Sequence, residues 1–393
     1  MIIPDPLPAV WPTAVRYILP WALILVLTRL SQQANTRPVR LVVGALTLAS
    51  ARCWLGGVQF KDPFWYWFNH LLSLGLAAIL LVVPRLCLLS DPYLPSRKMD
   101  HPVLCFLFHP LGQDFQPIPP FFQPARPKPT RSGKPFTNRE HLFRSLRGFA
   151  LMALILGYVR SYVPTLWTTD ESVRFSIFEK LSRPSPLLPA GTPAWVEGWL
   201  GGIALGGFVI CFLDAGYHTY AFMRGAQGEP GWGRITRSAW AATSIHSFWT
   251  THWHPLLSTF TQFYTALLIP SRLPSSIKNV ARSLIAFAIT ALTHDPSILP
   301  SATVNPHPSI LGGGVTKFML LQSLGLGLEY MFRAITGKRV GGFLGWIWAM
   351  GFLGWTARWA VQGFVDYGLV RGMALLGQKC VFRLSILSQL SSA

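Results

Sequence analysis

The chain has 393 residues, of which 51% are hydrophobic and only 12% are charged, and its formal net charge is +19. Soluble globular chains carry roughly 25% charged residues, so the composition excludes an ordinary soluble domain and indicates a polytopic α-helical membrane protein. It also argues against nucleic acid as a partner, because the basic residues lie mostly in short stretches between apolar segments rather than on a basic helix.

The apolar runs predict an all-α fold in a single domain of residues 1–393. A transmembrane helix needs about 20 mainly apolar residues, and by that measure the sequence predicts about 8–9 membrane segments around an internal reaction chamber. The fourth, sixth and seventh are short for a full crossing, as in tilted, broken or re-entrant helices. The predicted helices span residues 14–30, 39–57, 65–89, 148–163, 195–222, 256–270, 279–294, 315–335 and 343–365.

Charge predicts on which side of the membrane the connecting segments lie. The segment 90–147 is rich in proline and in basic residues, so we expect a cytosolic loop without regular helix. The short loop at 29–40, which carries Arg29, Arg37 and Arg40, falls on the same side. The segment 164–194 is balanced in charge and is expected in the lumen, whereas 223–238 returns to the cytosol with Arg224, Arg234 and Arg237.

The five cysteines are scattered, and no Cys or Cys/His spacing typical of a metal site is present. We therefore expect free thiols and no bound metal. The first apolar run has no basic region ahead of it, so it does not resemble a cleaved signal peptide and is expected to stay as a membrane anchor.

A dense aromatic and histidine cluster lies at 247–254, with the sequence Ser-Phe-Trp-Thr-Thr-His-Trp-His. Trp249 and Trp253 are four residues apart and would share one face of a helix. His254 precedes Pro255, which disfavours helical backbone and predicts a helix break where a side chain can point into a cavity. An aromatic belt at the membrane surface is the alternative interpretation.

A second histidine, His294, follows an apolar stretch that only Thr290 interrupts. An ionisable group at membrane depth is costly and indicates a functional site, although a structural histidine is the alternative. We expect His294 to end a short helix, and its neighbour Asp295 to be a surface residue at the helix terminus.

Further polar residues in apolar segments are expected to be structural. Asp214 and His218 are four residues apart and could pair on one helix face, and Glu329 lies alone in its segment. Arg358 is expected to extend its head group toward the membrane surface.

The pattern Phe248-Trp249-x-x-x-Trp253-His254 resembles a block of the wax-synthase-like branch of the membrane-bound O-acyltransferases, and the segment that ends at His294 is similar to that branch's second block. Thr250-Thr251 replaces the Gly-Arg pair of the first block, Pro255 stands where Gln is usual, and Thr290-Ala291 replaces the Ser-Gly pair of the second. The resemblance covers roughly the second half of the chain, with a wax-synthase-like core at 238–335.

The resemblance implies acyl transfer from acyl-CoA to an alcohol. His294 would be the general base, and His254 would donate a hydrogen bond to the developing oxyanion. Phe248, Trp249, Trp253 and Thr290 would line the chamber. Arg224, Arg234 and Arg237 are expected to dock the CoA phosphates, with ordinary topology-setting charge as the alternative. No bound cofactor is implied; acetyl-CoA or another acyl-CoA is the co-substrate.

The resemblance is strongest to fungal members that acetylate terpenoid or meroterpenoid natural products in secondary metabolism. The expected partners are acyl-CoA, a hydroxylated lipophilic small molecule and the lipid bilayer, and the expected location is the endoplasmic reticulum membrane. A long-chain wax-ester or sterol acyltransferase is one alternative. A transporter that uses Asp214, His218 and Glu329 as a proton or substrate path is the other, but the sequence shows no internal symmetry of the kind that many transporters have.

The topology is open to a direct test. Protease added to sealed microsomes should cut within 90–147, because the basic excess of this segment places it in the cytosol. Immunoblotting against tags at the two termini would locate the cut, and permeabilised microsomes give the control. Full protection of this segment in sealed microsomes would contradict the predicted orientation.

Overall fold

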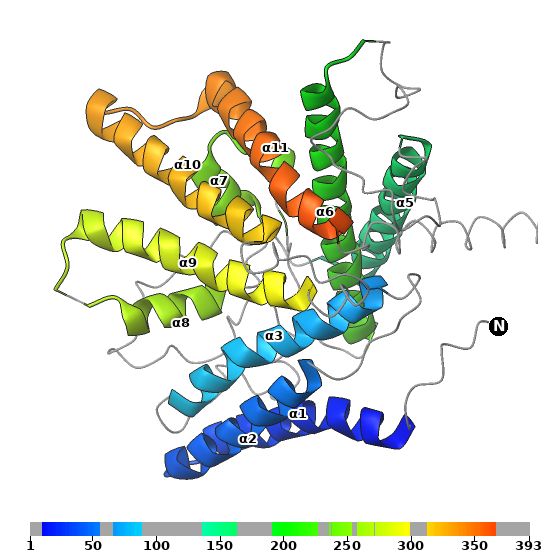
Figure 1. Ribbon diagram of the computed structural model, residues 1–393, viewed down its shortest axis with the longest axis vertical. Helices are drawn as coiled ribbons and strands as arrows, with labels where there is room; N and C mark the ends of the chain where they lie inside the picture. Colours follow the sequence, from blue (N-terminus) through cyan, green and yellow to red (C-terminus); the bar gives the residue numbers. More distant parts are fainter. Residues whose placement is uncertain are drawn as a thin grey trace, which may run out of the picture. The chain divides into compact units, whose positions relative to one another are not determined.

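The computed structural model describes residues 10–55, 66–88, 136–162, 191–226, 236, 238–253, 258–270, 272–298 and 313–366. Throughout this part the regular structure is helical, which confirms the expected all-α class (Figure 1). The long helices are α1 (Val10–Ser31), α2 (Arg37–Leu55), α3 (Tyr66–Leu88), α5 (Asn138–Tyr162), α6 (Ala194–Ala226), α8 (Ser258–Leu268), α9 (Ser275–Ile298), α10 (Gly314–Thr336) and α11 (Gly342–Asp366).

Each predicted helix has a counterpart, but two are longer than expected. Helix α5 has 25 residues and α9 has 24, so neither is short, whereas α8 has 11 residues and is as short as predicted. In the described part, two segments are long and apolar enough to cross a membrane, Asn69–Leu88 and Gly202–Met223. A further apolar helical segment, Ile18–Ser31, is shorter.

The start of α5 corrects the predicted extent of the 90–147 loop. Helix α5 begins at Asn138, within that segment, because Thr137 and Glu140 form a capping box. The Thr137 backbone N–H donates to the Glu140 carboxylate at 2.7 Å, and the Glu140 N–H donates to the Thr137 hydroxyl at 3.3 Å. The bond from the Thr137 backbone also lowers the pKa of Glu140. The rest of the predicted loop, up to residue 135, lies outside the described residues.

The end of α9 corrects a second expectation. His294 does not end the helix, which continues through Asp295 and Pro296 to Ile298. Proline lacks an N–H, so Pro296 removes only the bond to the carbonyl of Leu292, and the helix ends within the same turn. Asp295 therefore lies within the last turn of a helix and is not its terminal residue.

The chain divides into two compact units, each described by itself. The first contains α1, α2, most of α3, α8 and α9, with α1 packed on α2 and α8 packed on α9. Arg40, expected in a loop, is fully buried in α2, and its Nη1 donates to the Leu86 carbonyl at 2.5 Å. This carbonyl lies in the last turn of α3 and has no partner within its own helix, so Arg40 joins the two helices by capping it.

The second unit contains α5, α6, α10 and α11, together with short helical turns between residues 239 and 252. Here α5 packs along α6, α10 packs along α11, and α11 also packs on α6. Close approach of α5 to α6 depends on Gly148, because a Cβ at this position would lie 2.8 Å from the Ala215 Cβ and 3.2 Å from its backbone.

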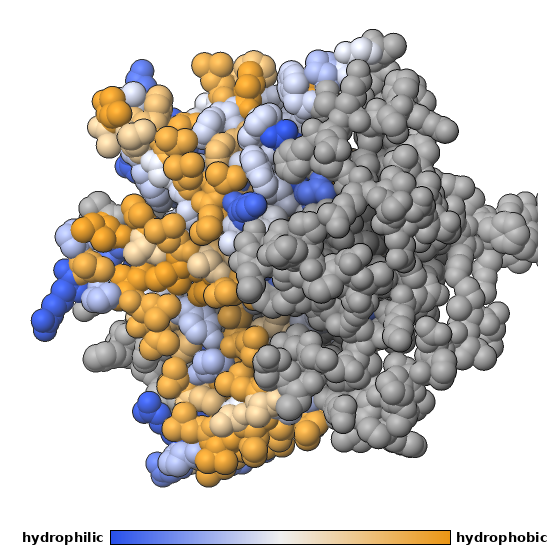
Figure 2. All heavy atoms as spheres, viewed as in Figure 1, coloured by the Kyte–Doolittle hydropathy of each residue, from blue (hydrophilic) through white to orange (hydrophobic). Residues whose placement is uncertain are grey.

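Large apolar side chains cover much of the exposed surface of the described helices. In Figure 2, apolar side chains predominate among the coloured residues, and hydrophilic groups appear at scattered points. Soluble monomers seldom expose contiguous apolar patches of more than a few hundred Å². A lipid environment around these helices accounts for this surface. Examples on α10 and α11 are Leu320, Leu324, Met331, Phe332, Ile335, Phe343, Leu344 and Ile347.

Two glycines of α5 give a matched test of the packing on α6. Gly148→Ala should lower the stability by about 1–3 kcal/mol, because the added methyl group meets backbone that cannot move away. Gly157→Ala is the control: in the described part of the chain its Cβ meets no atom within 4 Å, and the higher helix propensity of alanine favours the variant by up to about 1 kcal/mol. Thermal unfolding in detergent measures both. Equal midpoints for the two variants would contradict the close approach.

Candidate functional site

The predicted aromatic block folds as a short, irregular helical segment. Helix α7 (Ile245–Ser247) continues directly into a π-helical turn, η5 (Phe248–His252), and η4 (Ala239–Ala241) precedes both. The Trp253 N–H donates to the Phe248 carbonyl at 2.7 Å, five residues back, which closes the π-turn. Such turns are rare and occur often at functional sites, because the extra residue changes the direction of the side chains.

The three aromatic residues of the block form one cluster. The Phe248 and Trp249 ring centroids are 5.1 Å apart, those of Phe248 and Trp253 are 5.2 Å apart, and those of Trp249 and Trp253 are 5.5 Å apart. The predicted proximity of Trp249 and Trp253 is confirmed, although Trp253 lies just past the π-turn with extended backbone and not on a shared helix face. Edge and stacked contacts at these distances are favourable, so the cluster can form a rigid apolar wall.

A buried carboxylate binds the backbone of the short helix that leads into the aromatic block. Glu329 of α10 accepts the backbone N–H groups of Ile245 at 2.5 Å and His246 at 3.0 Å. It also accepts the Trp348 indole N–H at 2.9 Å. Glu329 is 8% exposed, and the three donors compensate for the loss of solvent. The expectation that Glu329 is structural is thus supported.

A second residue of α10 holds the middle of the block. Gln322 is fully buried, and its Oε1 accepts the Trp249 indole N–H at 3.2 Å. Its Nε2 donates to the Thr356 hydroxyl at 2.9 Å and to the Phe318 carbonyl at 3.2 Å. The contact with Trp249 could not be anticipated from sequence, because it joins residues 73 positions apart.

The end of the block is held by His252, whose ring Nδ1 lies 3.1 Å from the Ser238 carbonyl. A carbonyl only accepts, so Nδ1 carries the proton in this contact. His254, the predicted oxyanion donor, lies outside the described residues. The same holds for Arg234 and Arg237. Arg224 lies on α6, but its side chain is outside the described part.

His294 lies in the first unit, on α9, and contacts the predicted chamber residue Thr290. Its Nδ1 lies 2.8 Å from the Thr290 carbonyl, one turn earlier. Because the carbonyl accepts, Nδ1 is protonated and the lone pair of the neutral ring is on Nε2. Thr290 thus acts through its backbone, while its hydroxyl donates to the Ala286 carbonyl at 2.9 Å.

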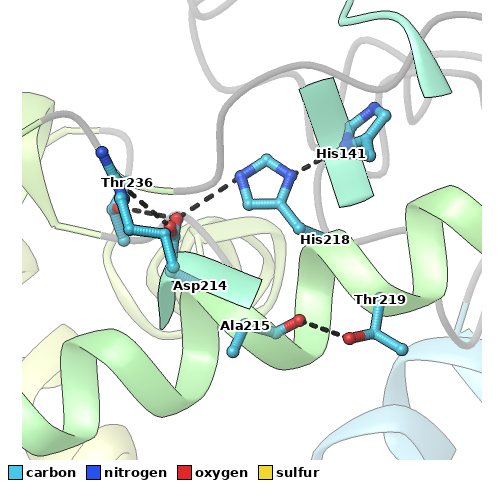
Figure 3. A network of polar contacts seen from close by, with 7 residues as sticks. His141, Asp214, Ala215, His218, Thr219 and Thr236 are labelled. Carbon is cyan, nitrogen blue, oxygen red and sulfur yellow. Dashed lines mark hydrogen bonds and ion pairs between the residues drawn. The ribbon is translucent and has the colours of Figure 1, made fainter. Parts of the chain in front are cut away.

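A third polar cluster joins α5 to α6 in the second unit (Figure 3). The predicted pair is present, with His218 Nε2 3.5 Å from Asp214 Oδ1. On the other side of the same ring, His218 Nδ1 lies 2.7 Å from His141 Nδ1. The Thr236 hydroxyl donates to Asp214 at 3.1 Å, and Arg147 lies 3.9 Å from its other oxygen.

His141, which was not among the predicted site residues, belongs to this cluster. Its signal was the small and polar set His141, Ser145 and Gly148, whose spacing of four and three residues places them on one helix face. Two facing Nδ1 atoms at hydrogen-bond distance need one proton between them, so one ring donates and the other accepts. The rings are 0% and 2% exposed, so this bond contributes to the packing of α5 on α6.

Within the described residues, no group of three or more His, Cys, Asp or Glu side chains is arranged to hold a metal ion. In the histidine cluster, Asp214 approaches the side of the His218 ring opposite to His141, so the three groups do not converge on one point.

Comparison with known proteins gives one match. Residues 232–311 match the model of the membrane bound O-acyl transferase family. The matched segment includes both sequence blocks, from Phe248 to His254 and the run up to His294. No curated protein and no solved structure matches the chain.

The histidine cluster gives a stability prediction. His218→Leu should destabilise the protein by about 1–3 kcal/mol, because His141 loses its buried hydrogen-bonding partner and Asp214 loses the imidazole that lies 3.5 Å from its carboxylate. His141→Leu together with His218→Leu should cost less than the two single variants added together, since both remove the same bond. Thermal unfolding of the four proteins in detergent measures this coupling. Strict additivity would contradict the direct contact.

Proposed function

We propose that the protein is a membrane-bound acyltransferase that transfers an acyl group from acyl-CoA to the hydroxyl of a lipophilic alcohol. The single observation that carries the proposal is the family match over residues 232–311, which spans the aromatic block and His294. The apolar surface of the described helices agrees with a site that receives a lipophilic acceptor from the membrane.

His294 is the proposed general base. Its Nδ1 proton is bound to the Thr290 carbonyl at 2.8 Å, so Nε2 has the lone pair that accepts a proton. As the alcohol oxygen attacks the thioester carbonyl, its proton moves to Nε2 and an oxyanion forms. Collapse of this intermediate breaks the C–S bond, and the proton passes from His294 to the departing CoA sulfur. General-base catalysis of this kind contributes roughly 10²–10⁴ in rate.

The aromatic block is the proposed wall of the reaction chamber. Phe248, Trp249 and Trp253 would exclude water, which otherwise competes with the alcohol for the thioester. His254 is proposed to donate a hydrogen bond to the oxyanion, and Arg224, Arg234 and Arg237 to bind the CoA phosphates. These assignments follow from the sequence resemblance.

For the substrates we propose acetyl-CoA as donor and a terpenoid or meroterpenoid alcohol as acceptor, in secondary metabolism at the endoplasmic reticulum membrane. A long-chain acyl donor defines the alternative activity, a wax-ester or sterol acyltransferase. Donor length depends on the room available beside the thioester, so a panel of acyl-CoA lengths separates the two.

Transport, the remaining alternative, is disfavoured by the contacts of Glu329. Glu329, a member of the supposed path, binds two backbone N–H groups and an indole at the start of α7. A carboxylate used in this way would have to release its partners to carry a proton.

The catalytic assignment is tested by His294→Ala. Acyl transfer per inserted protein should fall by about 10²–10⁴, because the attacking hydroxyl loses its proton acceptor. Ser283→Ala, on the same helix, is the control and should keep its activity. Microsomes given acetyl-CoA and a panel of terpenoid alcohols, analysed by mass spectrometry, provide the assay. Near-normal specific activity of His294→Ala would make His294 a structural residue.

A further inference from the structure

Two buried polar residues of α10 hold the aromatic block, although α10 lies beyond the matched segment. Gln322 and Glu329 are seven residues apart, which is two helical turns, so both side chains leave the same face of α10. Helix α10 packs against α7 in the same unit. The block is therefore held by residues that the family match at 232–311 does not include.

Glu329 fixes where the block begins. Its two oxygens receive the N–H groups of consecutive residues, Ile245 and His246, at the start of a helical turn. These N–H groups have no partner inside the helix, and a negative charge at this end is favourable. The carboxylate thus sets the position and the direction of the backbone that leads into the π-turn.

Gln322 fixes the ring that the block presents. The Trp249 indole N–H can only donate, so it selects the Oε1 side of the amide. The Nε2 group then donates to acceptors on two helices, the Thr356 hydroxyl on α11 and the Phe318 carbonyl on α10. A fully buried amide with both ends occupied has one orientation, and so does the indole bound to it.

We propose that Gln322 and Glu329 are positioning residues for the acyl-transfer reaction, acting through Trp249 and through the backbone of Ile245 and His246. This inference rests on the proposed function, in which the Phe248–Trp253 cluster is a wall of the chamber. Trp249 touches both Phe248 and Trp253, so a change in its ring angle moves the whole cluster. Misplacement by about 1 Å can reduce a rate by as much as 10²-fold.

A double-mutant cycle tests the link through Trp249. Gln322→Leu removes the acceptor and Trp249→Phe removes the donor, and each should lower kcat by roughly 10–100-fold with less change in KM for acetyl-CoA. Both substitutions break the same hydrogen bond. The kcat of the double variant should therefore be about equal to that of the less active single variant. Gln322→Glu keeps an acceptor for the indole but sets an oxygen against the Phe318 carbonyl, so it should recover only a small part of kcat. Ser323→Ala, the next residue on α10, is the control.

Hydrogen exchange gives a readout that does not depend on activity. In the intact protein, Glu329→Gln places an N–H group against a backbone N–H, and Gln322→Leu frees the indole. Both should increase amide exchange in residues 245–253 by at least about tenfold, with α5 and α6 unchanged, whereas Ser323→Ala should leave exchange as in the wild type.

The outcomes separate the positioning role from the proposed reaction. Coupled losses in kcat together with local exchange support the positioning role. Multiplicative losses in the cycle, or loss of inserted protein with normal specific activity, overturn it. If the wild type transfers no acyl group from acetyl-CoA or longer acyl-CoA, the proposed function fails, and the exchange result alone decides whether α10 holds the block. Unchanged exchange in both α10 variants would then overturn that as well.

Discussion

The buried carboxylate of Glu329 fixes the position of the aromatic segment within the second unit. It is buried, so it needs donors in place of water, and it finds them in two consecutive backbone N–H groups and one indole. Removing one partner of a buried charged hydrogen bond costs far more than the bond itself contributes. Because those donors come from the start of α7 and from α11, the aromatic segment must lie where Glu329 is, and its irregular π-turn is tolerated there.

The same rule explains the other contacts that join separate helices. Arg40 caps a carbonyl at the end of α3, and the His141–His218 bond joins α5 to α6. In apolar helices these polar groups have few alternatives, so each one specifies a particular neighbour. Apolar surface provides most of the driving force for burial in a soluble protein, but between helices in lipid it discriminates poorly, and polar pairs and close glycine contacts then decide the register.

In the proposed chemistry, the general base and the chamber wall are held in place by different kinds of contact. The tautomer of His294 is set within its own helix, because the Nδ1 proton is bound to the Thr290 carbonyl and Nε2 is left as the base. The aromatic cluster is instead held by hydrogen bonds from Gln322 and Glu329 of a different helix, α10. A catalytic base needs a defined tautomer, whereas a chamber wall needs a defined shape, and these requirements are met by a local backbone contact and by long-range contacts respectively.

Sequence alone determined the helical class, the approximate extent of the long helices apart from α5, and the Asp214–His218 pair, because these depend on hydrophobic runs and on spacing within one helix. It also indicated that Trp249 and Trp253 lie close together. It also marked His294, since an ionisable group in an apolar run stands out. The start of α5 was missed although Thr137 and Glu140 signalled it, because the basic residues after them were taken for loop. Only the tertiary structure decided that His141 meets His218, that Gln322 holds Trp249 and that Glu329 holds the start of α7. Those contacts join residues 73 to 84 positions apart, and no local periodicity records which distant helix satisfies a buried polar group.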